Sequence, residues 1–309
     1  MNAVDLSVRI GSLELRNPLM AASGCFGYGV EYAEAVDLAS IGAVVSKGLF
    51  LKERAGHPPQ RIVETPSGML NAVGLQNVGV RAFVAEKLPA LRKYATTVIA
   101  NVFGSCIEDY IEVLKILEDS DGLAGYELNI SCPNVKKGGM QFGADASQVA
   151  EVVGAARKAA VKRPLWVKLS PLVADIGVIS RAAAEAGADA LTVANTYPAM
   201  AVDFRSGKSR LGSLTGGLSG PAIKPITLRL VWEVRKSVEI PIIGLGGIEK
   251  VEDVLEYLSV GAKAVQVGTA SFANPQTTEE LVGDLERVSR IAKAFTINEI
   301  VRNFAEENS

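Results

Sequence analysis

In the stretch Glu127-Leu-Asn-Ile-Ser-Cys-Pro-Asn134, an apolar strand that covers residues 126–130 runs into a Ser-Cys-Pro turn. Pro133 has no backbone N–H and cannot continue a strand ladder, so the strand is expected to stop there. Asn129 and Cys132 then lie at its carboxyl end, ahead of a glycine-containing segment, residues 135–143. An amide and a thiol at a strand exit predict a reactive centre with a lid. The alternative is a buried structural cysteine beside an ordinary turn.

Similar apolar runs recur along the chain and alternate with helical patterns. The predicted strands cover residues 17–23, 43–48, 98–103, 126–131, 165–170, 190–196, 240–247 and 264–269. The predicted helices cover residues 32–40, 108–118, 147–162, 176–186, 222–237 and 251–260. Short strands that alternate with helices indicate an α/β protein with a parallel sheet, and eight such units favour a closed (β/α)8 TIM barrel. The alternative, an open doubly wound sheet, lacks a Gly-x-Gly-x-x-Gly fingerprint after the first strand.

The length of 309 residues suits one barrel-sized domain or two smaller ones. No linker, repeat or low-complexity segment divides the chain, so a single domain, residues 1–309, is predicted. Residues 6–15 alternate around Gly11-Ser12 and predict an N-terminal β-hairpin. The connections 48–97 and 197–220 are long and leave the carboxyl ends of strands, where the sites of such barrels lie.

Composition narrows the class of function. The net charge of −2, without a long basic run, argues against nucleic acid as a partner. No apolar segment approaches the roughly 20 residues of a membrane span, and no secretory signal is expected at the start. Cys25, Cys106 and Cys132 are few and far apart, which favours a reducing cytoplasm and argues against disulfides or an iron–sulfur cluster on this chain. His57 is interpreted as a solvated loop histidine, and no metal site is predicted.

The predicted strand exits together carry amides, lysines and glycines. Burying Lys or Asn costs several kcal/mol unless the side chain is paired. Each of these residues alone could be a structural polar group, but their number at the strand exits indicates a site. Gly244-Leu-Gly-Gly-Ile248 and Gly268-Thr269 suit a phosphate, with Gly216-Gly-Leu-Ser-Gly220 as a further source of donors. The alternative for these glycines is a tight turn without a ligand. A phosphosugar or a flavin would fit; Asn matches the edge of a flat heterocycle, and Lys168 could favour a reduced, anionic flavin.

The motifs resemble those of the dihydroorotate dehydrogenases, the flavin enzymes of pyrimidine synthesis. The matching stretches are Asn17-Pro-Leu-Met-Ala-Ala-Ser23, Ser46-Lys-Gly48, Asn71-Ala-Val-Gly-Leu75, Asn101-Val-Phe-Gly104, Asn129-Ile-Ser-Cys-Pro-Asn134, Val167-Lys-Leu-Ser170, Ala194-Asn-Thr196, Gly217-Leu-Ser-Gly220, Gly244-Leu-Gly-Gly247 and Val267-Gly-Thr269. The family uses Cys as the base in its soluble class and Ser in its membrane-associated class. Cys132 occupies that position. Residues 71–77, 195–197 and 217–225 look like the NAD-dependent heteromeric type, type B.

The resemblance implies the residues of the site. FMN, one per chain, would contact Ser23, Lys47, Gly48, Asn101, Asn129, Lys168, Ala194, Gly220, Gly246, Gly247, Gly268 and Thr269. Dihydroorotate would contact Lys47, Asn71, Ala72, Val73, Gly74, Leu75, Asn129, Asn195 and Thr196. Cys132 and Lys47 would be the catalytic residues, with Cys132 removing a proton from the ring methylene. Residues 135–142 would close over the substrate and exclude water.

The resemblance also implies partners. A homodimer of barrels would form a heterotetramer with a smaller subunit that holds FAD and a 2Fe-2S cluster and passes electrons to NAD. Two related enzymes are alternatives: a dihydropyrimidine dehydrogenase-like FMN barrel and a fumarate-using homodimeric dihydroorotate dehydrogenase. A non-catalytic phosphate- or flavin-binding barrel that scaffolds a partner is the alternative outside enzymes, and the intact Cys132 and Lys47 speak against it.

Overall fold

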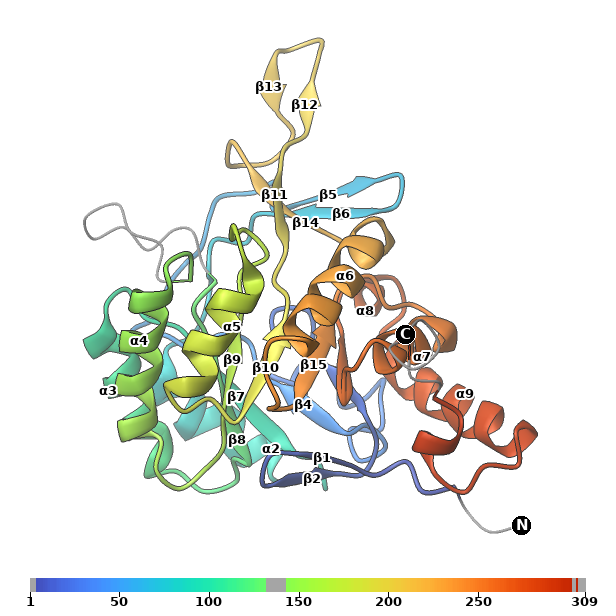
Figure 1. Ribbon diagram of the computed structural model, residues 1–309. Helices are drawn as coiled ribbons and strands as arrows, with labels where there is room; N and C mark the ends of the chain where they lie inside the picture. The colour runs from blue at the N-terminus through green and yellow to red at the C-terminus, as the bar shows by residue number, and fades with distance from the viewer. Residues whose placement is uncertain (1–3, 132–142, 302–303, 305–309) are drawn as a thin grey trace.

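A computed structural model of the protein describes residues 4–131, 143–301 and 304. Its centre is a closed parallel barrel, which confirms the predicted fold (Figure 1). In spatial order the strands are β3 (Leu19–Ala21), β4 (Ala43–Val45), β7 (Val98–Val102), β8 (Gly125–Asn129), β9 (Leu165–Lys168), β10 (Ala190–Val193), β15 (Ile242–Leu245) and β16 (Ala264–Val267). They are shorter than the predicted strands because the polar residues at their exits leave the ladder.

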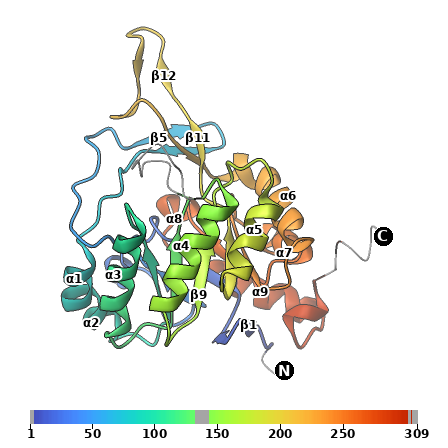
Figure 2. The same ribbon diagram turned by 60° about the vertical axis from the view of Figure 1, so that its left-hand side comes forward.

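Helices cover the outside of the barrel (Figures 1 and 2). The long ones are α3 (Ile107–Glu118), α4 (Ala146–Ala159), α5 (Ile176–Glu185), α6 (Lys224–Arg235), α7 (Val251–Ser259) and α9 (Thr277–Ile291), and the short ones are α1 (Val80–Ala82), η2 (Phe83–Lys87), α2 (Leu88–Leu91) and α8 (Ala270–Ala273). Single 3-10 turns are η1 (Val30–Tyr32), η3 (Pro221–Ile223) and η4 (Ile297–Glu299). Asp145 and Asp175 cap α4 and α5 by accepting hydrogen bonds from first-turn N–H groups. No helix in the described ranges is long and apolar enough to cross a membrane.

The helix predicted at residues 32–40 is wrong. The chain makes only the 3-10 turn η1 there and continues as turns. The Asp37 carboxylate accepts a hydrogen bond from the Ala39 N–H at 2.9 Å, and the Ser40 hydroxyl donates to the Asp37 carbonyl at 2.8 Å. Such local bonds of Asp and Ser offer the backbone an alternative to helical hydrogen bonds.

The barrel interior changes from apolar to polar along the strands. Its lower layer is apolar and includes Met20, Ile99, Trp166, Ile243 and Ala264, all fully buried. The predicted N-terminal hairpin, β1 (Val8–Ile10) with β2 (Leu13–Leu15), closes the amino end by adding buried Ile10 and Leu15 to this layer. Side chains two residues apart on a strand share a face, so the next inward layer contains Asn101, Glu127, Lys168, Thr192 and Gln266.

The two long connections form a second sheet above the carboxyl end of the barrel (Figure 1). Its strands lie in the order β11 (Tyr197–Ala199), β14 (Gly216–Ser219), β6 (Gly68–Asn71) and β5 (Ile62–Thr65). A further hairpin, β12 (Val202–Asp203) with β13 (Lys208–Ser209), projects from it. These strands were not predicted because they are very short, and β14 is half glycine, which disfavours a strand on propensity alone.

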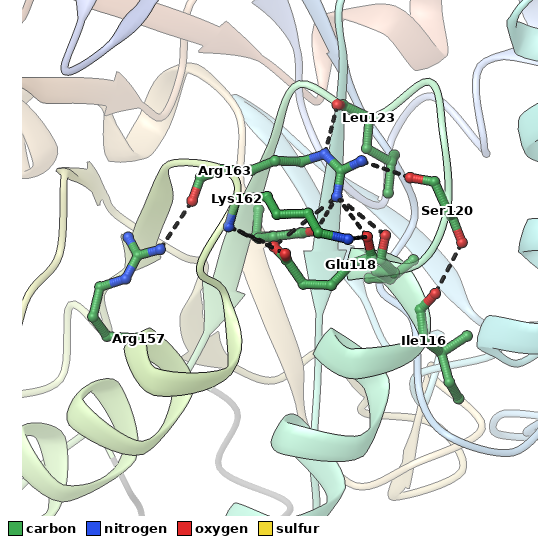
Figure 3. A network of polar contacts seen from close by, with 9 residues as sticks. Ile116, Glu118, Ser120, Leu123, Arg157, Lys162 and Arg163 are labelled. Carbon is green, nitrogen blue, oxygen red and sulfur yellow. Dashed lines mark hydrogen bonds and ion pairs between the residues drawn. The ribbon is translucent and has the colours of Figure 1, made fainter.

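Arg163 ties together the amino ends of β8 and β9 (Figure 3). Its guanidinium donates to the carbonyls of Leu123 at 2.9 Å and Ser120 at 2.6 Å, and to the Tyr126 hydroxyl at 2.8 Å. Weaker bonds reach the last carbonyls of α3. The Glu118 carboxylate lies 4.0 Å away and accepts the Lys162 N–H at 3.1 Å. A planar guanidinium with several N–H donors suits a set of carbonyl and hydroxyl acceptors of this kind, so Arg163 is a structural clamp.

Candidate active site

A cavity of about 320 Å³ opens at the carboxyl end of the barrel. The second sheet contributes to its wall through Met69 and Asn71 of β6 and Gly216 and Gly217 of β14. All but one of the residues predicted to contact FMN line it: Ser23, Lys47, Gly48, Asn129, Lys168, Ala194, Gly220, Gly246, Gly247, Gly268 and Thr269. All of the residues predicted to contact the substrate line it too: Lys47, Asn71, Ala72, Val73, Gly74, Leu75, Asn129, Asn195 and Thr196. One concave space therefore gathers both predicted sets.

Lys168 is the most buried charge at this wall, with 4% of its surface exposed. Its ammonium lies 3.9 Å from Glu127 Oε1, which is an ion-pair distance and too long for a hydrogen bond. Within the described ranges Lys168 Nζ donates no hydrogen bond. An ammonium has three donors, and burying them without acceptors is costly, so the geometry suits a ligand that supplies acceptors.

Lys47 also lines the cavity and is half-buried. Burial lowers the pKa of Lys47, and the nearby positive charge of Arg61 lowers it further, while Glu31 opposes both. An anionic ligand beside Lys47 would stabilise its charged form and oppose the lowering of its pKa, so this lysine suits an anion.

Three side chains at the exits of β8 and β10 form a hydrogen-bonded chain. Asn195 Nδ2 donates to Ser131 Oγ at 2.5 Å, and Ser131 Oγ donates to Asn129 Oδ1 at 2.6 Å. Asn195 Oδ1 also accepts the Thr196 N–H at 2.7 Å, and Tyr110 supports the Asn129 carbonyl at 2.9 Å. Among the described residues no acceptor is found for Asn129 Nδ2, so this donor can serve a ligand in the cavity that Asn129 lines. The chain fixes the two amides that are predicted to hold a flat heterocycle.

The loop after β6 forms another part of the wall. Asn71 Nδ2 donates to the Gly217 carbonyl at 3.3 Å, which joins this loop to β14. Leu75 has φ = 60°, an uncommon conformation for a residue with a side chain, and it follows Gly74 at φ = 74°. A Cβ at Gly74 would lie 2.4 Å from the His57 backbone nitrogen, so the loop packs tightly against His57.

His57 lines the cavity, which the interpretation as a solvated loop histidine missed. Its backbone N–H donates to the Val73 carbonyl at 3.1 Å, and Nδ1 lies 3.2 Å from the Ala72 carbonyl. The sequence did not predict this contact, because it joins two loops that have no hydrophobic period. Met69 and Phe272 are further wall residues that carried no signal in the sequence, and Gln76 was noted only as part of the stretch 71–77.

The glycines of the last strand exits fit a phosphate group. Gly246 and Gly247 have φ = 151° and 70°, and Gly220 has φ = 97°, conformations that favour glycine. A Cβ at Gly247 would lie 2.8 Å from the Gly220 carbonyl oxygen, so these backbones approach each other closely. Together with Gly268 and Thr269 they line the cavity, and glycine-rich exits of this kind can present backbone N–H groups to a phosphate. The residues present therefore fit the phosphate end of FMN.

Asn101 differs from the other predicted FMN contacts. It is fully buried beneath the cavity wall, and its Nδ2 donates to Glu127 Oε1 at 2.6 Å. It is absent from the wall, where Gly48 lies above it: a Cβ at Gly48 would be 3.0 Å from Asn101 Oδ1. Its direct contact with FMN stays a prediction.

The predicted base, Cys132, and the predicted lid, residues 135–142, lie outside the described residues. Of the other two cysteines, Cys25 lines the cavity, and burial raises its pKa to about 11 although the charge of Lys168 opposes the shift. Burial also raises the pKa of Cys106, which is away from the cavity wall. Both thiols are protonated near neutral pH and are poor candidates for a base.

The fold and the cavity define a TIM-barrel protein with a candidate ligand site at its carboxyl face, lined by two lysines, several amides and several glycines. The family model for dihydroorotate dehydrogenase matches residues 5–288. A protein of Pelobacter propionicus is 55% identical over 283 residues, 92% of this chain and 93% of its own. Proteins of Geobacter sp. (strain M21), 52% identical over 93% and 94%, and Thermodesulfovibrio yellowstonii, 48% identical over 97% and 99%, are also similar. All three are named dihydroorotate dehydrogenase B (NAD(+)), catalytic subunit. The chain belongs to the dihydroorotate dehydrogenase family and is an oxidoreductase.

Proposed function

We propose that the chain oxidises (S)-dihydroorotate to orotate in UMP synthesis and that its electrons reach NAD through a partner subunit. The observation that carries the proposal is the convergence of the predicted substrate and cofactor residues on one cavity. The names of the three relatives support the reaction and the electron acceptor.

FMN is the proposed cofactor, one per chain. The glycine exits of β15 and β16 fit its phosphate, and the buried Lys168 ammonium offers donors to its ring. Bound FMN would supply the hydride acceptor for the substrate carbon that bears the carboxylate. FAD is disfavoured here because the sequence contains no dinucleotide fingerprint after a strand.

The residues of the chain bind and orient the substrate. Asn129, Asn195 and Thr196 offer amide and hydroxyl groups to its ring, and Lys47 offers a positive charge to its carboxylate. Cys132, at the family's base position in the sequence, takes the proton from the ring methylene. Residues 135–142 are proposed to exclude water during the reaction.

The partner is proposed to be a smaller subunit with FAD and a 2Fe-2S cluster, docked on a homodimer of barrels in the cytoplasm. The relatives' designation as a catalytic subunit supports a separate second chain. The three cysteines of this sequence are too few for the four ligands of a usual cluster, which also favours a partner as the place of the cluster.

Anaerobic reduction of the bound flavin by dihydroorotate tests the proposal. Cys132→Ala is expected to keep FMN and to slow flavin reduction roughly a hundredfold to ten-thousandfold, the contribution of a positioned base. Cys132→Ser is expected to regain rate only at high pH, because a hydroxyl ionises less readily than a thiol. Cys106→Ala is the matched control, since this thiol is outside the cavity wall. A near-normal rate for Cys132→Ala, or FAD in the mass spectrum of the released cofactor, would contradict the proposal.

A second measurement separates the related enzymes. The isolated chain is expected to reduce an artificial dye with dihydroorotate and to reduce NAD slowly. Fast NAD reduction without a partner would refute the two-subunit arrangement, and fast fumarate reduction would favour the homodimeric type. Faster turnover of dihydrouracil than of dihydroorotate would favour a dihydropyrimidine dehydrogenase.

A further inference from the structure

Glu127 is a carboxylate in the middle of the barrel, with none of its surface exposed. It lies on β8, directly between the apolar lower layer and the cavity, and it is not part of the cavity wall. An isolated buried carboxylate is strongly disfavoured, so one that is retained needs partners. The proposed reaction assigns it no task, and the family motif on this strand begins two residues later, at Asn129.

The partners of Glu127 come from three other strands. Oε1 accepts a hydrogen bond from Asn101 Nδ2 at 2.6 Å, and Oε2 accepts from Thr192 Oγ1 at 2.8 Å and Gln266 Nε2 at 2.5 Å. Gln266 lies on β16, four strands from β8 in either direction around the barrel, so this bond crosses the barrel interior. The carboxylate is held from three sides, and its position is therefore fixed relative to the barrel.

The fourth neighbour of Glu127 is Lys168. The Oε1–Nζ distance of 3.9 Å keeps the two charges paired without a hydrogen bond between them. The same oxygen accepts its hydrogen bond from Asn101 at 2.6 Å. The arrangement compensates the charge of Lys168 from below and leaves its N–H groups for acceptors in the cavity.

We infer that Glu127 is a positioning residue that sets how strongly the site prefers reduced over oxidised FMN, by placing a fixed negative charge beneath Lys168. This inference rests on the proposed function, because it assumes that FMN binds above Lys168. A positive charge beside the flavin ring favours the reduced, anionic form. The Glu127 carboxylate weakens that preference, so its removal makes the site more positive and shifts the balance toward reduced FMN.

The test measures the midpoint potential of the bound FMN in three holoproteins: wild type, Glu127→Gln and Glu118→Gln. Glu127→Gln is expected to raise the ratio of the affinities for reduced and oxidised FMN about tenfold, which is about 30 mV for a two-electron couple. Glu118→Gln is the matched control: it makes the same chemical change in another buried carboxylate, 6% exposed, at the amino end. It is expected to leave the potential unchanged. An unchanged or lower potential in Glu127→Gln, or an equal shift in both variants, would overturn the inference.

A second variant covers the case in which Glu127→Gln does not fold. Thr192→Val removes one hydrogen bond to Oε2 and preserves the shape of the side chain. With one donor fewer, the negative charge of the carboxylate is less compensated and acts more strongly on Lys168. The ratio of the affinities for reduced and oxidised FMN is therefore expected to fall about twofold. An unchanged ratio or a shift toward reduced FMN would contradict the inference. If dihydroorotate reduces the wild-type flavin but neither variant changes the potential, the proposed function survives and only the role of Glu127 fails.

Discussion

Two buried carboxylates with basic neighbours occupy opposite ends of the same barrel. At the amino end, Glu118 lies 4.0 Å from Arg163, whose donors reach backbone carbonyls and a tyrosine hydroxyl within the protein (Figure 3). Toward the carboxyl end, Glu127 lies 3.9 Å from Lys168, whose ammonium donates to no described residue. The similar distances conceal different roles. A cation whose donors serve the protein stabilises the fold, whereas a cation whose donors remain available suits a ligand.

The largest expected effect is on the structural pair. Arg163→Met leaves Glu118 buried and several backbone carbonyls without a donor, and removing one partner of a buried ion pair costs about 3–5 kcal/mol. Urea unfolding of the FMN-free protein measures this loss in the free energy of unfolding. Arg287→Met is the control, since Arg287 is 69% exposed and is expected to change stability by less than about 0.5 kcal/mol. Equal losses in the two variants would remove the distinction between clamp and surface residue.

Lys168→Met is expected to act mainly on the ligand. The affinity for FMN should fall roughly 10- to 150-fold, the size of a hydrogen bond from a charged group. The unfolding free energy of the FMN-free protein should fall less than in Arg163→Met, because the ammonium donates to no described residue. Isothermal titration with FMN and urea unfolding measure the two quantities. A loss of stability as large as that of Arg163→Met, with unchanged affinity, would make Lys168 a structural residue like Arg163.

A third buried carboxylate, Asp253, extends the comparison to the outer helices and has the smallest expected effect. Burial alone would raise its pKa, but hydrogen bonds from Lys224 at 2.6 Å and from the N–H groups of Glu249 and Lys250 outweigh burial and lower it. A carboxyl whose pKa is lower in the folded state stabilises the fold above the unfolded pKa of 3.8, and this contribution disappears as the pH falls below it.

Asp253→Asn is therefore expected to lose about 1.5 kcal/mol at pH 7, near the lower limit for hydrogen bonds to charged groups. Its free energy of unfolding should fall less than that of wild type as the pH drops below 3.8. Urea unfolding at several pH values measures the acid limb of the stability curve. A variant that follows the wild-type curve in parallel would show that Asp253 does not contribute to the acid limb.

Much of the fold follows from periodicity and punctuation in the sequence. Eight apolar runs between helices indicate the barrel, and Gly11-Ser12 indicates the hairpin. The strand predicted over residues 126–131 ends slightly earlier, because β8 stops at Asn129. The inventory of strand exits located the cavity, because parallel strands bring their carboxyl ends to one face. The failures were local: Asp37 and Ser40 make turn hydrogen bonds where a helical pattern was expected, and the strands of the second sheet are too short to show a period.

By itself the sequence determined the parallel barrel, its family and the face on which its site lies, because alternation and strand exits are properties of consecutive residues. Only the tertiary structure decided that Glu127, Asn101, Thr192 and Gln266 meet beneath Lys168 and that His57 reaches the cavity wall. In a predicted barrel strand, Glu127 is one polar residue among apolar ones. Its partners lie as far as 139 residues away along the chain, and strand register and barrel closure alone bring them within hydrogen-bond distance.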